Sequence, residues 1–380
     1  MQSEQLIENL QSAFKSKRLY AVKKLAEKSE RGERGDGSGI TITFRSVYCG
    51  FDCYPSMLAY KAFKEGFGSV GLADYASLSG VKEFAKSCAI FKVPYYSGMG
   101  VKAEADGKKA LLLALGVPAA NVKRLHKSLA KARALKAKHV EKIRDAINEK
   151  FAKYRLYLPP TLKIFKKSKA ASAETLYGAL AQKISEKFTD ENAVLKFLTE
   201  ELGFSPTVAD EEKLADKTST LYASDLASIL RNYLGFKDMK EKALPAKDIV
   251  ATVKACGALP AMVYDGSAPD AFFAKVKKLG VKCVCFEPDK YALDARDFYD
   301  RAVENGVLPI ARKVLDRPRK RVETQFDEEL ARLYEECALA LCGHQISVDV
   351  NPDDGLFTEK TANALPDLKA RVKLYSKIQK

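Results

Sequence analysis

Charged and phenolic side chains recur at or just beyond the ends of short apolar runs in this chain. Seven such residues are Arg45, Asp74, Tyr75, Tyr264, Asp265, Glu287 and Arg312. If the runs are parallel strands, these residues gather at the edge where the strands end. Two guanidinium groups there could hold a phosphate or carboxylate through paired hydrogen bonds. A network of ion pairs, with Arg45 bonded to Asp74, explains the same residues equally well.

The chain is poor in residues for nucleophilic or metal chemistry. It has three histidines. His126 and His139 are predicted at the surface of lysine-rich helices, and His344 is predicted to cap the end of a helix. No Ser-His-Asp or Cys-His arrangement can be assembled, so no catalytic residue is assigned. Cys49 and Cys53 lack the further ligands that a structural zinc site needs.

Composition indicates an ordinary globular protein of the cytoplasm. Eight cysteines in 380 residues are too sparse for a disulfide framework. No run of eighteen apolar residues suits a membrane span, so no membrane partner is expected. The first residues open a polar amphipathic stretch without the apolar core of a secretion signal.

The chain is also basic. Its 64 lysine and arginine residues against 49 aspartate and glutamate residues give a formal net charge of +15. Such a charge suggests an anionic partner, either nucleic acid, a phosphorylated metabolite or an acidic protein. Basic runs at 123–133, 163–169 and 312–321 could contact phosphates, but no nucleic-acid-binding motif accompanies them. Solvated helix faces explain the runs better, so nucleic acid is not the favoured partner.

Short apolar runs alternate with helical stretches over much of the chain. Seven predicted strands lie at 40–44, 69–73, 93–97, 110–115, 259–264, 281–286 and 307–311. Strands that alternate with helices favour parallel pairing. A closed barrel and an open doubly wound sheet both fit this rhythm. No glycine-rich phosphate loop follows the first strand, which weakens a nucleotide-binding open sheet.

The remaining segments read mostly as helix. Residues 1–29 carry apolar positions at spacing three and four, and the glycine-rich stretch 31–39 then breaks the pattern. Residues 118–245 have helical stripes and no convincing strand, which predicts a helical insertion. A late helix is predicted at 326–341. Residues 346–350 read as one more strand or as a tail that packs against the body.

Three stretches resemble the polymerase-and-histidinol-phosphatase (PHP) domain family. Residues 71–80 are similar to the family's second motif, in which apolar residues precede Asp-His-Asp and a later glycine. Residues 54–67 resemble the helix before that motif, and 98–100 stand where the family has Gly-x-Glu. The resemblance covers 40–117 and, more faintly, 246–320. It implies a distorted seven-stranded barrel and the fold of a metal-dependent phosphoesterase.

This chain departs from the family at the metal ligands. The positions of those ligands hold Thr43, Arg45, Tyr75, Ala76, Gly100, Tyr264, Ala311, Arg312 and Lys313, and Asp74 alone is kept. Threonine, tyrosine, glycine and alanine are not the imidazole and carboxylate ligands that divalent transition metals need. An arginine would also repel the ions. The resemblance with these departures therefore predicts no metal, no cofactor and no metal-dependent hydrolysis.

The expected fold is a PHP-like, distorted seven-stranded parallel (β/α) barrel with a large helical insertion. The expected parts are an N-terminal helical segment and linker (1–39), the barrel (40–117 and 246–350), a helical cap over its mouth (118–245) and a C-terminal tail (351–380). The favoured function is binding of a small anionic ligand, or of a partner protein, at the barrel mouth. One alternative is an active phosphoesterase with a reduced metal site. Another is a nucleic-acid-associated protein that uses the basic insertion.

Overall fold

The chain folds as two compact units. The computed structural model describes residues 3–30, 40–51, 53–161, 172–190, 192–217, 219, 222–236, 239–291, 294–315 and 326–378. The predicted connector 31–39 and the basic runs 163–169 and 317–321 lie outside them. The barrel unit comprises Met1–Tyr48, Asp52–Arg133 and Ala243–Lys380, and the helical unit comprises Cys49–Phe51 and Ala134–Lys242. No helix among the described residues is long and apolar enough to cross a membrane.

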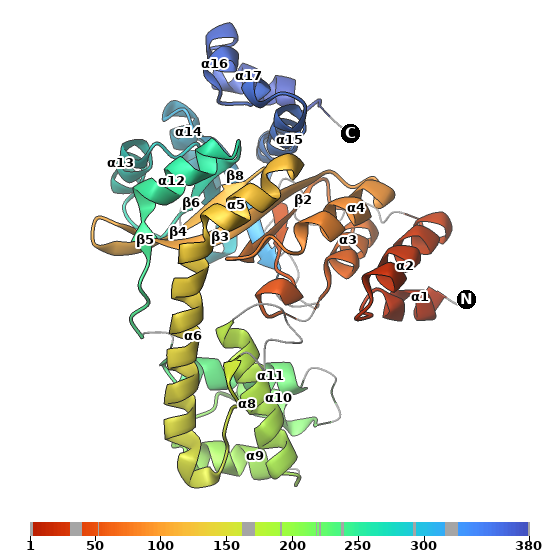
Figure 1. Ribbon diagram of the computed structural model, residues 1–380, viewed down its shortest axis with the longest axis vertical. Helices are drawn as coiled ribbons and strands as arrows, with labels where there is room; N and C mark the ends of the chain where they lie inside the picture. Colours follow the sequence, from red (N-terminus) through yellow and green to blue (C-terminus); the bar gives the residue numbers. More distant parts are fainter. Residues whose placement is uncertain are drawn as a thin grey trace. The chain divides into compact units, whose positions relative to one another are not determined.

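Seven strands of the barrel unit pair into a closed ring (Figure 1). They are β1 (Thr41–Phe44), β2 (Val70–Tyr75), β3 (Tyr95–Ala105), β4 (Lys108–Leu115), β6 (Leu259–Val263), β7 (Cys283–Phe286) and β8 (Leu308–Leu315). Each strand pairs with the next in this order, and β8 pairs with β1. All seven strands predicted from the sequence are present. Ring closure leaves no open sheet edge, which decides against the doubly wound alternative.

The ring is not wholly parallel, which corrects the expectation of a parallel barrel. β4 runs antiparallel to β3 and β6, whereas the other pairs of the ring are parallel. A two-residue turn joins β3 to β4, with a φ of 50° at Asp106 and 74° at Gly107. Such hairpin turns favour Asp-Gly because both central residues need positive φ. This dipeptide is the signal in the sequence that predicts the hairpin.

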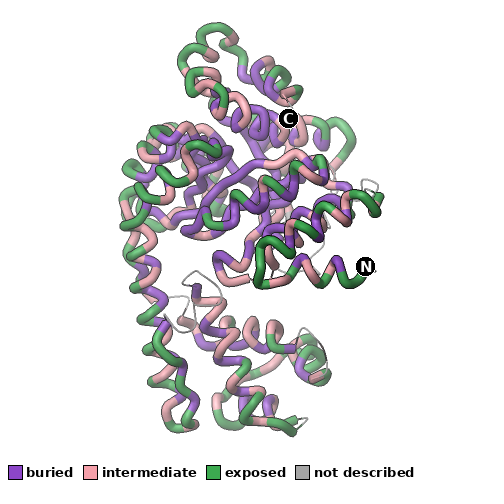
Figure 2. The backbone as a smooth tube through the Cα atoms, turned by 45° about the vertical axis from the view of Figure 1, so that its right-hand side comes forward, coloured by how far each residue is buried: buried purple, intermediate pink, exposed green. Residues whose placement is uncertain are grey.

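The two faces of the strands bury separate cores. Outward side chains pack under α3 (Pro55–Lys64), α4 (Val81–Phe91), α12 (Ala246–Ala255), α13 (Pro269–Leu279) and α14 (Ala295–Glu304). Inward side chains such as Tyr96, Leu113, Cys285 and Ile310 belong to a second core. Figure 2 shows the strands buried, while the covering helices carry exposed residues. Neighbouring residues of a strand point to opposite faces, which explains the division.

One end of the ring is covered by the long helix α15 (Glu328–Val350). Leu341 of this helix belongs to the inward core. The Gln345 side-chain oxygen accepts hydrogen bonds from the backbone N (2.8 Å) and Oγ (2.7 Å) of Ser97, near the start of β3. The structure contradicts a strand at 346–350, because this segment completes α15. Its alternating β-branched residues suggested a strand, but the buried residues Leu341 and Gln345 keep the four-residue spacing of a helix.

Both ends of the chain pack as parts of the barrel unit. At the N-terminus, α1 (Ser3–Asn9) precedes α2 (Lys15–Lys28), which contacts α3 and α4. At the C-terminus, α16 (Glu359–Ala364) and α17 (Leu368–Tyr375) follow α15. An added Cβ on Gly343 of α15 would lie 2.0 Å from the carbonyl oxygen of Tyr375 in α17. α15 and α17 therefore approach closely at a residue without a side chain.

The described residues between β4 and β6 are mostly helical. Its helices are α5 (Val122–Ser128), α6 (Ala130–Phe151), α8 (Ala173–Lys187), α9 (Ala193–Lys196), α10 (Val208–Ala215) and α11 (Tyr222–Tyr233). Val140, Ile143, Ile147 and Phe151 form the buried stripe of α6 that the sequence predicts. His139 is buried too, which corrects its predicted surface position. The exception to the helical pattern is the short strand β5 (Leu244–Pro245), which pairs with β3.

His344 lies inside α15 and not at a helix end, which corrects its predicted role as a cap. Its side chain is buried, and its Nδ1 accepts a hydrogen bond from Leu356 N at 3.1 Å. Since Nδ1 is an acceptor, Nε2 carries the proton and donates to the carbonyl oxygen of Gly257 at 3.1 Å. Burial lowers the pKa of His344 from 6.5 to about 4, so the ring is neutral at neutral pH.

Protonation of His344 should weaken folding as the pH falls. The unfolded side chain takes up its proton near pH 6.5 and the folded one only near pH 4, so the unfolded state binds more protons between these values. The stabilisation is fully present above pH 6.5, and we expect about 2 kcal/mol of it to be lost by about pH 5. Urea denaturation of the wild type and of His344→Gln, above pH 6.5 and at about pH 5, measures this loss. Equal pH dependence in the two proteins would contradict the assignment.

Candidate functional site

The end of the ring opposite α15 gathers the carboxyl ends of the parallel strands. α15 lies where β3 and β6 begin, since Gln345 bonds to Ser97 and His344 to Gly257. Barrels place their functional residues where the strands finish. We call this end the mouth and define it by Arg45, Tyr75, Gly100, Lys102, Glu287 and Arg312.

Arg312 is a buried cation on the inner face of β8. Its side chain is 3% exposed, and its Nη2 donates to Glu287 Oε1 at 2.8 Å. The two residues meet because Phe286 pairs with Ala311, and each charged residue follows its member of that pair. The Nε of Arg312 is also buried, and within the described part of the chain it has no hydrogen-bond acceptor. The predicted site residues Glu287 and Arg312 therefore come into direct contact.

The structure also corrects the position of Arg312 within its element. The sequence predicted that the strand ends at residue 311, with Arg312 just beyond it. β8 instead continues to Leu315, so Arg312 is held inside a strand between β1 and β7. A strand residue has a fixed direction, and Arg312 shares its face with Leu308 and Ile310 of the inward core. Its guanidinium is therefore positioned by the ring and not by a loop.

Tyr96 occupies the interior of the ring and is not among the predicted site residues. Its side chain is fully buried, and its hydroxyl is hydrogen-bonded to Thr43 Oγ1 at 2.8 Å. Gly71 lies opposite Tyr96 in the ladder between β2 and β3. An added Cβ on Gly71 would lie 2.2 Å from two atoms of the phenol ring, so only glycine leaves room for the ring. Burial raises the pKa of Tyr96, which keeps the phenol protonated despite the nearby charge of Arg312.

Tyr75 completes the inner face of β2 at the mouth. It pairs with Gly100 of β3, where an added Cβ would lie 3.6 Å from Tyr75 Cδ2. The Nζ of Lys102 lies 6.0 Å from the centre of the Tyr75 ring, within the range of a cation–π interaction. Lys102 was not among the predicted site residues. It places a positive charge on the face of β3 that carries Gly100.

Asp74 holds the chain that follows β1. Its Oδ1 accepts a hydrogen bond from the backbone N of Ser46, and its Oδ2 accepts one from Ser46 Oγ, each at 2.6 Å. The carboxylate is buried, and it lies on the opposite face of β2 from Tyr75. Hydrogen bonds to an ionised carboxylate are stronger than neutral ones, so Asp74 fixes Ser46 firmly. The pairing of Asp74 with Arg45, which begins this segment, stays a prediction.

Tyr264 and Asp265 lie outside the mouth. The sequence grouped them with the site because they follow β6, but Tyr264 belongs to the outward core. Its ring packs against Phe272 with a centroid distance of 5.1 Å, and its hydroxyl donates to the carbonyl oxygen of Ser267 at 2.6 Å. Asp265 is more than a third exposed and lies 3.5 Å from Lys275 Nζ. The period-two alternation explains the direction of Tyr264, since β6 ends on the inward Val263 and the next side chain points outward.

The side chains of the mouth do not suit the metal cluster that the PHP resemblance would imply. Thr43, Arg45, Tyr75 and Gly100 stand at ligand positions, and none of them is an imidazole or a carboxylate. The charge of Arg312 further disfavours a cation in the ring. Among the described residues, no group of three or more histidine, cysteine, aspartate or glutamate side chains could hold a metal ion.

Comparison with known proteins finds matches among solved structures at low sequence identity. No family model and no curated protein matches the sequence. A solved candidate metal-dependent phosphoesterase from Bifidobacterium adolescentis matches with a TM-score of 0.47 and 13% identity, over 78% of this chain and 96% of that one. An amidohydrolase from Chromobacterium violaceum, solved with bound sulfate and no metal, matches with a TM-score of 0.49 and 12% identity over the same shares. At these values neither likeness establishes a shared activity.

Filling the space beside Tyr96 should destabilise the protein. In Gly71→Ala the new methyl group would meet a buried ring at 2.2 Å, and we expect a loss of at least about 2 kcal/mol in the free energy of unfolding. Gly100→Ala is a matched control on the neighbouring strand, because its nearest neighbour would lie at 3.3 Å and belongs to a flexible leucine side chain. Urea denaturation of both variants measures the difference.

A double variant shows whether the ring causes this loss. Tyr96→Leu removes the ring atoms that the methyl group of Gly71→Ala would meet, so it should recover much of the cost of Gly71→Ala when the two are combined. Strictly additive losses would show that Gly71 is needed for another reason.

Proposed function

We propose that this protein is a divergent PHP-type barrel without metal-dependent hydrolysis, which binds a small phosphate- or carboxylate-bearing ligand at the mouth. One observation carries the proposal: Arg312 Nε is a buried donor without an acceptor among the described residues. A buried donor that lacks a partner costs about 1–3 kcal/mol. An oxygen atom of a bound anion would recover that cost.

A second buried arginine supports this interpretation by contrast. Nε and Nη2 of Arg18 donate to the two carboxylate oxygens of Glu83, at 2.8 Å and 2.5 Å. Arg312 pairs its Nη2 with Glu287 in a similar way, at 2.8 Å. Nε and Nη2 form the edge with which arginine binds carboxylates and phosphates. Arg18 has both atoms of this edge paired, whereas Arg312 has one, and this difference favours a ligand at Arg312.

The size of the ligand follows from burial. The side chain of Arg312 is only 3% exposed, so the rigid surface of a partner protein would not reach its Nε. A small anion could do so. Lys102 on β3 and Arg45 after β1 add positive charge at the same end of the ring, and the formal net charge of the whole chain is +15. The positive residues at the mouth and the positive net charge both favour the approach of an anion.

Thermal unfolding tests the role of Arg312. Millimolar inorganic phosphate or acetate should raise the melting temperature of the wild type by a few degrees above chloride at equal ionic strength, because a ligand that binds only the folded state stabilises it. Arg312→Lys keeps a positive charge beside Glu287 but loses the two-nitrogen edge, so this variant should lose the response. Lys24→Met, on the exposed face of α2, should retain it.

Two results would contradict the proposal. One is an equal anion response in the wild type and Arg312→Lys, or none in either. The other comes from metal analysis of the purified protein. About one equivalent of a transition metal, together with hydrolysis of a phosphate ester, would favour the alternative of a phosphoesterase with a reduced metal site.

A further inference from the structure

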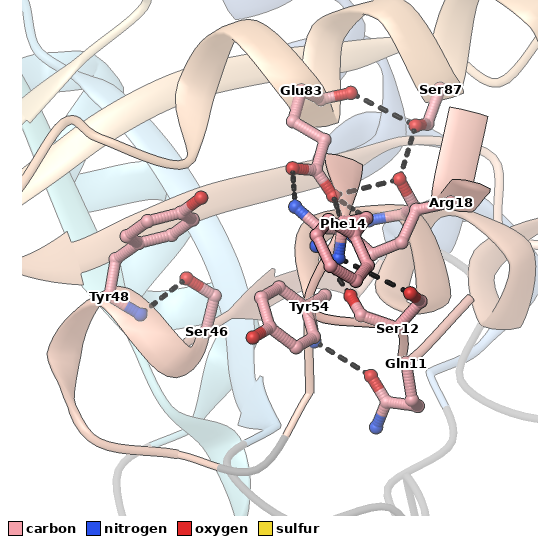
Figure 3. A network of polar contacts seen from close by, with 10 residues as sticks. Gln11, Ser12, Phe14, Arg18, Ser46, Tyr48, Tyr54, Glu83 and Ser87 are labelled. Carbon is pink, nitrogen blue, oxygen red and sulfur yellow. Dashed lines mark hydrogen bonds and ion pairs between the residues drawn. The ribbon is translucent and has the colours of Figure 1, made fainter. Parts of the chain in front are cut away.

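The N-terminal helices are joined to the barrel unit by a fully buried ion pair. Arg18 of α2 and Glu83 of α4 are 2% and 1% exposed, and the pair is bidentate. Nη1 of Arg18 donates in addition to the carbonyl oxygen of Ser12 at 2.6 Å (Figure 3). Burial opposes the charge of Arg18, but the hydrogen bond and the negative charge of Glu83 raise its pKa above the ordinary value. The guanidinium of Arg18 is therefore charged in the folded protein.

The Arg18–Glu83 pair also contacts Tyr54 and Ser56, which follow the mouth residue Arg45 along the chain. Glu83 Oε1 accepts hydrogen bonds from the backbone N of Ser56 at 3.3 Å and from Ser56 Oγ at 2.8 Å. The guanidinium carbon of Arg18 lies 3.9 Å from the centre of the Tyr54 ring. Gln11, which lies between α1 and α2, accepts a hydrogen bond from Tyr54 N at 3.0 Å. Figure 3 shows the bond between Tyr54 and Gln11.

Residues 45–48 and 53–56 of the barrel unit link the mouth to these contacts, and we call them the β1 segment. At its start, Ser46 is bonded to Asp74 of β2. Within it, Val47 N donates to the carbonyl oxygen of Cys53 at 3.0 Å. At its end, Tyr54 is bonded to Gln11 between α1 and α2, and Ser56 is bonded to Glu83 of α4. The segment is thus anchored to the ring at one end and to the N-terminal helices at the other.

Attaching the N-terminal helices to the barrel unit does not by itself require a buried ion pair. Apolar packing of similar volume often stabilises a protein as well as a buried ion pair does, and the pair instead imposes a defined geometry. Here the geometry has a consequence, because one oxygen of Glu83 receives Arg18 Nε and both donors of Ser56. Loss of Arg18 would leave that carboxylate buried and only partly neutralised. Glu83 would also lose the bidentate contact that fixes its position opposite Ser56.

We propose that the N-terminal helices act as a clamp that orders the β1 segment, with Arg18 as the positioning residue. Arg18 acts through Glu83 on Ser56 and through its own contact on Tyr54. The clamp fixes the segment whose first residue is Arg45 of the mouth. The consequence for ligand binding rests on the proposed function, whereas the ordering of the segment does not.

Hydrogen exchange measures the ordering directly, without a ligand. In Arg18→Met, peptides that cover the β1 segment should lose at least about tenfold protection relative to peptides from β7, which report overall stability. Lys24→Met, on the same helix, should leave both sets of peptides unchanged. If α2 loosens while the β1 segment keeps the protection of the wild type, the clamp is disproved.

A second variant keeps the test decisive if Arg18→Met does not fold. Arg18→Met combined with Glu83→Met removes both charges and leaves apolar packing in their place. The N-terminal helices should then stay protected, while Ser56 and Tyr54 lose the bonds that the ion pair supplies. Full protection of the β1 segment in this double variant would show that packing alone orders it.

Binding of inorganic phosphate provides the second readout. The phosphate concentration at half-maximal stabilisation should rise at least about fivefold in Arg18→Met and stay unchanged in Lys24→Met. If the wild type does not respond to phosphate, the proposed function fails, and the exchange result alone decides the clamp. If the wild type responds and Arg18→Met responds equally despite a loosened β1 segment, the clamp does not act on the mouth.

Discussion

An arginine enclosed by a ring of strands can be neutralised only by groups that the ring places around it, or by a group that enters at one end. Arg312 is in this situation, because β1 and β7 flank its strand and the inward core lies against it. α15 covers one end of the ring, so the mouth is where an additional acceptor would enter. Glu287 neutralises the charge but does not satisfy every donor. The proposed anion site follows from this shortage of acceptors.

Much of the fold can be predicted from the sequence because hydrophobic periodicity records which faces are buried. Each of the seven strands contains a short apolar run, as expected for strands covered on both sides. Periodicity does not record direction, and for that reason β4 was taken as parallel. Direction depends on the connection, and the Asp106-Gly107 turn is too short for a crossover. The segment 346–350 was misread for a related reason, since five residues are too few to separate a strand from the end of a helix.

The candidate site could be predicted only in part, because site geometry depends on register. The sequence places Glu287 and Arg312 near strand ends, and the pairing of β7 with β8 makes them neighbours. Tyr264 was grouped with them, but one residue of alternation directs it to the outward core. Tyr96 was missed because nothing in its own segment marks it. Its signal is Gly71 in the neighbouring strand, and that signal is visible only once the two strands are aligned.

Arg18 and Arg312, two of the three buried arginines among the described residues, use the same chemistry with different degrees of completion. Arg18 has a partner for each of its three nitrogen atoms, and its carboxylate partner serves Ser56 as well. Because every nitrogen of Arg18 already has a partner within the protein, this network suits a fixed joint. Arg312 has a carboxylate on one nitrogen and an unused donor on another. A buried donor is costly until it is paired. The protein is therefore expected to bind an anion at Arg312 and to keep its shape at Arg18.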